Sequence, residues 1–262
     1  MSTLTIAAVQ YDIQWLDQQA NFKHLEGLIS DYFNANSAVD LLLLPETFST
    51  GFCINRKDVQ EPENGGTALI WLKKIAQQYN CVVAGSVLVS QNDKKVNRFY
   101  WVFANGSVEH YDKRHLFRLG NEQDHVEQGK SRKVITINGV KILPLVCYDL
   151  RFPVWSRNRQ DYDLMVNVAN WPAARRHIWD TLLKARAMEN QSFVVGVNRI
   201  GADGNHTAHS GGSTIIDFTG ENLVTAKDNQ QQIITMQLDF SELAKFKEGF
   251  QAFLDADEFE LR

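Results

Sequence analysis

The sequence predicts an α/β protein with antiparallel additions to its sheet, on the basis of three observations. Short runs rich in Val, Ile and Leu recur along all 262 residues, as buried strands do. Segments with helical periodicity lie between several of these runs, which is the alternation of an α/β fold. The runs at 99–103 and 107–111 are joined by Asn105-Gly106, a turn pair typical of an antiparallel hairpin.

The predicted strands are apolar runs that end at Gly, Pro, Asn or Asp, the residues that favour turns. In chain order they are 4–9, 41–44, 81–89, 99–103, 107–111, 142–147, 164–168, 193–197, 213–216 and 233–238. The chain has only five prolines and no Ser/Gly-rich tract, and 44% of its residues are hydrophobic. We therefore expect residues 1–262 to form a single domain with a sizeable core.

Three predicted helices carry apolar residues at three-and-four spacing and therefore have one face suited to a sheet. They cover 17–33, 67–79 and 177–190. The tail from 249 to 262 is less periodic and combines three phenylalanines with acidic residues. Because a solvated tail rarely needs three large apolar side chains, we expect this tail to pack on the protein's own body or on a second subunit.

The charge and cysteine content exclude several classes of protein. The chain has 27 lysines and arginines against 31 aspartates and glutamates, a net charge of −4 with the signs mixed, which does not suggest a nucleic-acid partner. Three widely spaced cysteines argue against a disulfide framework and match a reducing compartment. No apolar run approaches the roughly 18 residues of a membrane span, so we expect a cytoplasmic protein without a membrane partner.

Cys147 ends an apolar run and precedes a polar turn, within the sequence LPLVCYDLRFP. Open α/β folds place reacting groups at the carboxyl ends of strands. A turn or short helix at 148–152 would present N–H groups that favour a thiolate or hold an oxyanion. The alternative is a buried structural thiol, since free cysteine is among the most buried residue types.

Two further turns supply a candidate base and a candidate cation. Glu46 directly follows the run LLLLP, so we expect a poorly solvated carboxylate that can accept a proton. The alternative is a carboxylate that caps the end of a strand. Lys113 and Arg114 follow the predicted strand at 107–111, and a basic turn taken alone is typical of a solvated surface.

None of the seven histidines has the sequence context of a thiol–imidazole pair, so a histidine-free site must be considered. His206 and His209 have a spacing that two metal ligands could use, but no cysteine or carboxylate neighbours them at zinc-site spacing. We therefore expect polar surface roles for the histidines and no metal site.

The segments LLLLPETFSTGF, YDKRHLF and LVCYDLRFP occur in the order Glu, Lys, Cys, and together they resemble the pattern of the nitrilase superfamily of carbon–nitrogen hydrolases. The resemblance continues through NVANWP at 167–172 and ARAMENQ at 185–191 to the closing DADEFEL, so it covers nearly the whole chain. It implies a four-layer α-β-β-α sandwich. It also implies association into a homodimer or a larger homo-oligomer.

Carried over to this sequence, the resemblance assigns Cys147 as the nucleophile, Glu46 as the general base and Lys113 as the catalytic lysine. It also implies a second glutamate downstream of the lysine. The spacing of that segment favours Glu122, with Glu127 as the alternative. The implied chemistry requires no metal or organic cofactor.

Within the superfamily the resemblance points to the bacterial omega-amidases, which act on 2-oxoglutaramate and related monoamides. A nitrile or another amide or carbamoyl substrate is the alternative, and a binding protein with a vestigial triad is the alternative class. An omega-amidase must hold a distant carboxylate, for which the candidates are Arg175, Arg176 and Arg151, although Arg151 could instead pair with an acidic neighbour to hold its turn. The apolar walls of the pocket are expected from Phe48, Phe52, Tyr148 and Trp171.

Overall fold

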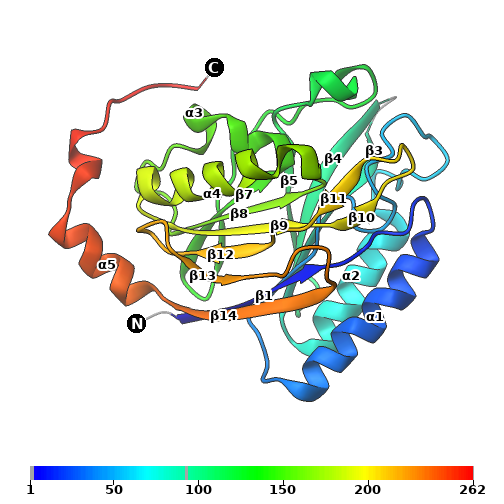
Figure 1. Ribbon diagram of the computed structural model, residues 1–262, viewed down its shortest axis with the longest axis horizontal. Coiled ribbons are helices and arrows are strands. Elements are labelled where there is room, and N and C mark those ends of the chain that lie inside the picture. The colour runs from blue at the N-terminus through cyan, green and yellow to red at the C-terminus, as the bar shows by residue number, and fades with distance from the viewer. Residues whose placement is uncertain (1–2, 92–93, 262) are drawn as a thin grey trace.

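The computed structural model describes residues 3–91 and 94–261, and two six-stranded sheets form its centre (Figure 1). The first sheet has the order β14-β1-β2-β3-β4-β5, the second has the order β13-β12-β9-β8-β7-β6, and β10 pairs separately with β11. The strands are β1 (Thr3–Gln10), β2 (Leu41–Leu43), β3 (Val82–Gln91), β4 (Lys94–Val102), β5 (Val108–Asp112), β6 (Ile135–Ile137), β7 (Val140–Val146), β8 (Leu164–Ala169), β9 (Phe193–Asn198), β10 (Ile200–Ala202), β11 (Ala208–Ser210), β12 (Thr214–Ile216), β13 (Asn222–Thr225) and β14 (Gln232–Asp239).

Helices cover the outer faces of the two sheets (Figure 1). α1 (Gln18–Ala35) and α2 (Gly66–Tyr79) pack on the first sheet, whereas α3 (Pro153–Ser156) and α4 (Arg176–Asn190) pack on the second, and α5 (Phe240–Gly249) follows β14. The predicted α/β class and the four-layer α-β-β-α sandwich are therefore confirmed. Across the described part of the chain, none of these helices combines the length and apolar character needed to cross a membrane.

The four leucines at 41–44 show how one strand serves two packed layers. Leu41 and Leu43 face the core between the two sheets, and Leu42 and Leu44 face the core beneath α1 and α2. Successive side chains of a strand point to opposite faces, so a strand buried on both faces is a continuous apolar run. β2 pairs in parallel with β1 and with β3, which places it inside the first sheet.

All ten predicted strands and all three predicted helices are present, with ends that differ by no more than five residues. The largest difference is at β4, which begins at Lys94 rather than near Phe99. The first half of this strand was not predicted because it contains polar residues. Two of them, Lys95 and Asn97, are nevertheless buried. The Asn97 side chain contacts Glu46, and the Lys95 side chain binds the loop at 54–56.

Several short elements had no sequence signal. β6, β10, β11 and β13 contain three or four residues each, which is too short to establish a period of two. α5 spans ten residues between β14 and the tail, and α3 is a single turn that begins at Pro153. These elements complete the sheet edges and connections without changing the predicted class.

The C-terminal tail contacts the body of the protein in part. Gln191 donates a side-chain hydrogen bond of 2.8 Å to the carbonyl of Phe250, and the guanidinium of Arg159 lies 4.5 Å from the centre of the Phe259 ring. Phe250 and Leu254 are nevertheless 61% and 66% exposed. Packing of the tail on a second subunit stays a prediction.

Candidate active site

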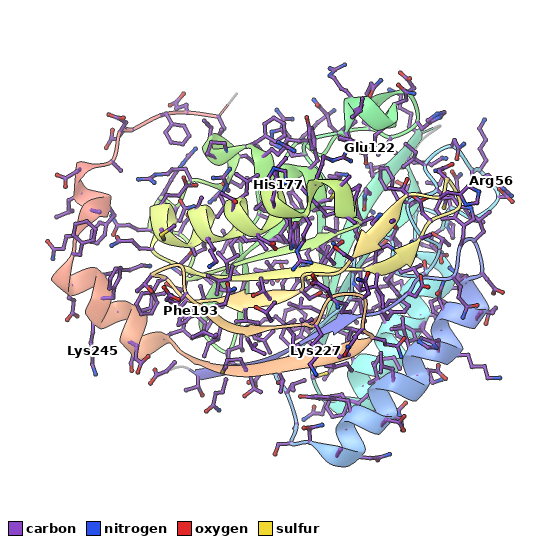
Figure 2. All side chains as sticks on the ribbon, in the orientation of Figure 1. Arg56, Glu122, His177, Phe193, Lys227 and Lys245 are labelled. Carbon is purple, nitrogen blue, oxygen red and sulfur yellow. The ribbon has the colours of Figure 1, made fainter. Side chains whose placement is uncertain are left out.

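The candidate residues come from both sheets and lie just after the ends of strands. Glu46 follows β2 and Lys113 follows β5 in the first sheet, whereas Cys147 follows β7 in the second. Glu122 lies in a short 3-10 turn, η2 (Glu122–Asp124), on the connection from β5 to β6, where Figure 2 labels it. The fold thus brings together four residues that are separated by as many as 101 positions, since 147 − 46 = 101.

Lys113 is the centre of the charged cluster. Its Nζ lies 3.1 Å from Glu46 Oε1 and 3.0 Å from both oxygens of Glu122, and all three side chains are buried. The same Nζ lies 5.1 Å from the centre of the Phe52 ring. Two carboxylates therefore fix a single ammonium in a site from which water is largely excluded.

Hydrogen-bond donors hold both carboxylate oxygens of Glu46 and its backbone carbonyl. The side chain of Asn97 donates to Oε1 over 2.8 Å, and the backbone N–H of Asn170 donates to Oε2 over 2.8 Å. Asn170 also donates its side-chain amide to the carbonyl of Glu46 over 2.6 Å. Such donors stabilise an ionised carboxylate and fix its orientation.

Cys147 occupies a strained position at the start of a 3-10 turn, η3 (Cys147–Arg151). Its φ of 47° lies in the left-handed region, which non-glycine residues adopt rarely and often at functional sites. Burial, followed by the charge of Glu46, raises the pKa of Cys147 well above its usual value, and Lys113 opposes this only in part. The resting group is therefore a thiol, and the expected stabilisation of a thiolate by the turn is outweighed.

The ionisation of Lys113 and Glu122 follows from their mutual contact. Burial alone would lower the pKa of Lys113, but the adjacent carboxylates of Glu122 and Glu46 outweigh it and raise that pKa. Burial raises the pKa of Glu122, and the charge of Lys113 opposes that shift. Lys113 therefore remains an ammonium at neutral pH.

Asp149 fastens the turn after Cys147 to the segment that carries Lys113. Its carboxylate accepts hydrogen bonds from the Tyr111 hydroxyl over 2.8 Å, from the Val146 N–H over 3.1 Å and from the backbone N–H of His115 over 2.8 Å. The ring Nδ1 of His115 also lies 2.7 Å from it. This buried carboxylate therefore links the two sheets beside the candidate nucleophile.

The structure places Glu122, and not Glu127, against Lys113. Glu122 also accepts a 2.7 Å hydrogen bond from the backbone N–H of Phe117, which anchors its loop. Glu127 lines a different cavity, and its backbone N–H donates to the carbonyl of Lys95. The sequence-based preference for Glu122 therefore agrees with the geometry.

A cavity of about 310 Å³ opens over the cluster. Of the residues expected to contact a substrate, Tyr148, Arg151 and Trp171 line it, together with Arg175 and Phe52. The remaining lining residues are Glu46, Ile54, Asn55, Lys113, Phe117, Gly120, Asn121, His125, Cys147, Asn170, Pro172, Asp203, Asn205, Thr207 and His209.

Phe48 does not line this cavity, so its predicted role as a pocket wall is corrected. Its side chain is fully buried in the core beneath α1 and α2, with its ring centre 5.6 Å from that of Trp71. A Cβ on Gly85 would lie only 2.8 Å from the Phe48 ring, so the glycine makes room for it. The residue follows Thr47, whose φ of 45° turns the chain sharply after Glu46.

Two further expectations about charged residues are corrected. Arg176 pairs with Asp180 at 2.7 Å and with Asp228 at 2.8 Å, and it does not line the cavity. Arg151 takes part in none of the ion pairs found among residues 3–91 and 94–261, so no acidic neighbour holds its turn through a salt bridge there. Its guanidinium instead lies 5.4 Å from the centre of the Trp171 ring.

The histidines differ in their surroundings. His209 is buried and lines the cavity, contrary to the expected surface role, and burial followed by the charge of Arg199 lowers its pKa to about 4. His206 is exposed on the same hairpin. Within the described ranges, no group of three or more His, Cys, Asp or Glu side chains is placed to hold a metal ion.

Three residues in or around the cluster had no predicted role. Asn97 is one of several polar residues in the first half of β4, and nothing in its spacing marks it. Asp149 and Asn170 lie within motifs that support the resemblance, LVCYDLRFP and NVANWP, and this position is the signal that marks them. Their contacts depend on which strands become neighbours, which local sequence does not specify.

Comparison with known proteins agrees with this geometry. A model of the carbon–nitrogen hydrolase family matches residues 5–248. The chain is 44% identical to the omega-amidase YafV of Yersinia enterocolitica over 99% of each chain, and 34% identical to a 2-oxoglutaramate amidase of Bacillus subtilis over 96% of each. XC1258 of Xanthomonas campestris, a CN-hydrolase superfamily protein whose crystal structure has an arsenic adduct in the active site, is 39% identical over all of both chains, with a TM-score of 0.95. The chain belongs to the carbon–nitrogen hydrolase family of the nitrilase superfamily.

Proposed function

We propose that the protein is an omega-amidase that hydrolyses the terminal amide of small dicarboxylate monoamides such as 2-oxoglutaramate and 2-oxosuccinamate. The observation that carries the proposal is the placement of Cys147, Glu46 and Lys113 in one cavity that also contains two arginines. The names of the relatives from Yersinia enterocolitica and Bacillus subtilis support the substrate class.

In the acylation step, Glu46 takes the proton of the Cys147 thiol as the sulfur attacks the amide carbon. The negative charge on the amide oxygen is stabilised by the Lys113 ammonium and by the backbone N–H of Tyr148, which follows the nucleophile. Protonated Glu46 then donates its proton to the departing nitrogen. Ammonia leaves, and the acyl group remains on Cys147 as a thioester.

In the deacylation step, water replaces ammonia and Glu46 takes one of its protons. The hydroxide oxygen attacks the carbonyl carbon of the thioester, and the carbon–sulfur bond breaks. Protonated Glu46 then returns its proton to the Cys147 thiolate. Glu122 does not line the cavity, so we assign it to holding Lys113 and the Phe117 loop rather than to contacting the water. Each step balances without a cofactor.

Replacement of the nucleophile and the base tests this proposal. Cys147→Ala should release no ammonia from 2-oxoglutaramate, and quenched wild-type enzyme should show the acyl mass on the peptide that contains Cys147. Glu46→Gln should retain the fold while turnover falls by a factor on the order of 10² to 10⁴. Ammonia release by Cys147→Ala, or a preference of the wild type for simple nitriles over monoamides, would overturn the proposal.

The same chemistry supports a cytoplasmic location. The three cysteines are free, and Cys147 must stay reduced to act as the nucleophile. Cys53 and Cys81 are buried and lie outside the cavity lining, so we assign them packing roles.

A further inference from the structure

Two arginines lie at the end of α4 where a positive charge is least favourable. Arg175 precedes the helix, Arg176 begins it, and its first turn contains no acidic residue. The N-terminus of a helix is the positive end of its macrodipole, so cations there are destabilised and anions are stabilised. Figure 2 labels His177 in this turn.

The two arginines differ in how their charge is neutralised. Arg176 is paired with Asp180 and Asp228. Arg175 takes part in none of the ion pairs found in the described residues, and its guanidinium lies 5.2 Å from the centre of the Phe117 ring inside the cavity. An uncompensated cation at a helix N-terminus contradicts the local electrostatic preference, and such conflicts are expected at functional sites.

Arg151 adds a second uncompensated cation to the same cavity. Both arginines contact Trp171, since Arg151 lies over its ring and the Trp171 Nε1–H donates a 2.8 Å hydrogen bond to the carbonyl of Arg175. Lys113, the remaining lysine or arginine in the lining, is already held by two carboxylates.

The acidic residues of the cavity do not neutralise these arginines. Glu46 is bound to Lys113. Asp203 accepts backbone N–H groups from Asn205 over 2.8 Å and from Thr207 over 2.9 Å, which holds its own turn. Neither arginine therefore has an anionic partner among the acidic residues that line the cavity.

We propose that Arg175, supported by Arg151, binds the distal carboxylate of the substrate. This inference rests on the proposed function and specifies how that site selects its substrate. A guanidinium presents a planar fork of donors that matches a carboxylate, and the helix N-terminus adds a favourable field. The pocket then selects anionic amides, and the dicarboxylate product occupies the same place.

The same arrangement disfavours glutamine. In glutamine an ammonium group sits beside the distal carboxylate, and it would face the two arginines that bind that carboxylate. A 2-oxo acid has a neutral carbonyl at this position, which is also a hydrogen-bond acceptor. Hydrolysis of 2-oxoglutaramate should therefore exceed that of glutamine in kcat/KM, and equal values would contradict the proposal.

A binding experiment tests the carboxylate site without catalysis. Succinate, the expected product from succinamate, should raise the Tm of the wild type and should have little effect on Arg175→Gln. Without ligand, Arg175→Gln should have a Tm at or above that of the wild type, because a repulsive charge is removed. The matched control Arg176→Gln should have a lower Tm, because its ion pairs are lost, and should still respond to succinate.

A kinetic experiment uses two amides of the same length, succinamate and butyramide, which differ by a carboxylate in place of a methyl group. In Arg175→Gln the preference for succinamate should fall by 10- to 100-fold, mainly through KM, as expected for the loss of a charged hydrogen bond. Arg175→Lys should retain an intermediate preference, and Arg176→Gln should retain the wild-type preference.

The outcomes separate this inference from the proposed function. If Arg175→Gln slows both amides by the same factor, or if succinate stabilises it as much as the wild type, Arg175 is structural and the inference is wrong. If the wild type hydrolyses neither amide nor 2-oxoglutaramate while succinate still stabilises it through Arg175, the carboxylate site stands and the proposed amidase function fails.

Discussion

Asn97 makes hydrogen bonds to both Glu46 and Lys113. Its side chain donates to Glu46 Oε1 over 2.8 Å, and its backbone carbonyl accepts the N–H of Lys113 over 2.9 Å. The residue is fully buried on β4. We therefore regard Asn97 as a positioning residue for the proposed base.

Removal of this donor should slow the reaction. In Asn97→Ala the carboxylate of Glu46 loses one hydrogen bond that fixes its orientation, so we expect kcat/KM to fall by about 10- to 100-fold. Steady-state kinetics with 2-oxoglutaramate measures this effect. Asn97→Asp preserves the side-chain volume but replaces the donor by an acceptor, and full activity in that variant would contradict this role.

His209 makes the stability of the fold depend on pH. Burial lowers its pKa to about 4 in the folded protein, against about 6.5 in the unfolded chain. The unfolded state therefore binds the extra proton first as the pH falls, and the stability present above pH 6.5 is lost progressively towards pH 4. The loss from this group amounts to about 3 kcal/mol at pH 4.

Urea unfolding between pH 7 and pH 4 measures this contribution. His209→Gln should lose less unfolding free energy over that range than the wild type, because it lacks the titrating ring. His206→Gln, on the exposed part of the same hairpin, should behave as the wild type does. Parallel curves for wild type and His209→Gln would show that the ring does not contribute.

Individual site residues were predictable where a reactive residue type lies at the end of a predicted strand. Glu46 and Lys113 follow predicted strands and Cys147 ends one, and the structure brings the three together. Phe48 was assigned wrongly, because the sharp turn at Thr47 sends the next side chain into the core rather than into the cavity. The direction of a single side chain depends on a backbone torsion that its residue type does not reveal.

At the scale of elements, Lys95 on β4 joins two loops that line the cavity. Its buried Nζ donates 2.6 Å hydrogen bonds to the carbonyls of Ile54 and Arg56, and its own carbonyl accepts the N–H of Glu127 over 2.7 Å. The first loop contributes Phe52, Ile54 and Asn55 to the lining, and the second contributes Phe117, Gly120, Asn121 and His125.

Loss of the Lys95 ammonium should loosen the first loop and leave two carbonyls without donors. We expect Lys95→Met to raise KM for 2-oxoglutaramate several-fold with a smaller change in kcat, and to lower the unfolding free energy by about 1–3 kcal/mol. Steady-state kinetics and urea unfolding measure these effects. The control is Lys94→Met, whose side chain is exposed; equal behaviour of the two variants would exclude a loop-positioning role.

Elements were predictable where they are long and apolar. β8 and β9 appear as mainly apolar runs, each with one asparagine, because both faces of the second sheet are covered. The first half of β4 was missed because it contains the polar residues Lys95 and Asn97. Their side chains form hydrogen bonds with a cavity loop and with Glu46 rather than following an apolar pattern. The η2 turn that carries Glu122 has no periodicity, so only the spacing of its motif indicated the residue.

At the scale of the molecule, α3, α4 and the tail carry several exposed apolar side chains. Val154 on α3 and Met188 on α4 are 57% and 51% exposed, and Phe250 and Leu254 of the tail are more so. The tail and the end of α4 border a common small pocket, so these parts lie close together. We therefore expect two copies of the chain to associate through α3, α4 and the tail.

Light scattering during size exclusion measures this association. The wild type should elute with the mass of a dimer or larger oligomer, and a double substitution, Met188→Glu with Leu254→Glu, should shift it towards the monomer. Ile70 on α2 is 69% exposed on the opposite helical layer, so Ile70→Glu is the matched control and should leave the mass unchanged. A monomeric wild type would contradict the expectation.

The overall architecture was predictable to the level of layers, through the alternation of strands and helices and through the resemblance. The pairing of β14 with β1 was not, because it joins segments more than 200 residues apart whose apolar patterns fit several edges. Local sequence specifies which segments become strands. The order of strands within a sheet depends on the whole set of competing pairings.

The division of the site between two sheets has a consequence for how the protein is made. Glu46 and Lys113 are synthesised before Cys147, and β14, the last strand in chain order among the described residues, pairs with β1 at the edge of the first sheet. The three side chains are aligned only when both sheets have formed. We therefore expect a chain truncated before β14 to lack amidase activity.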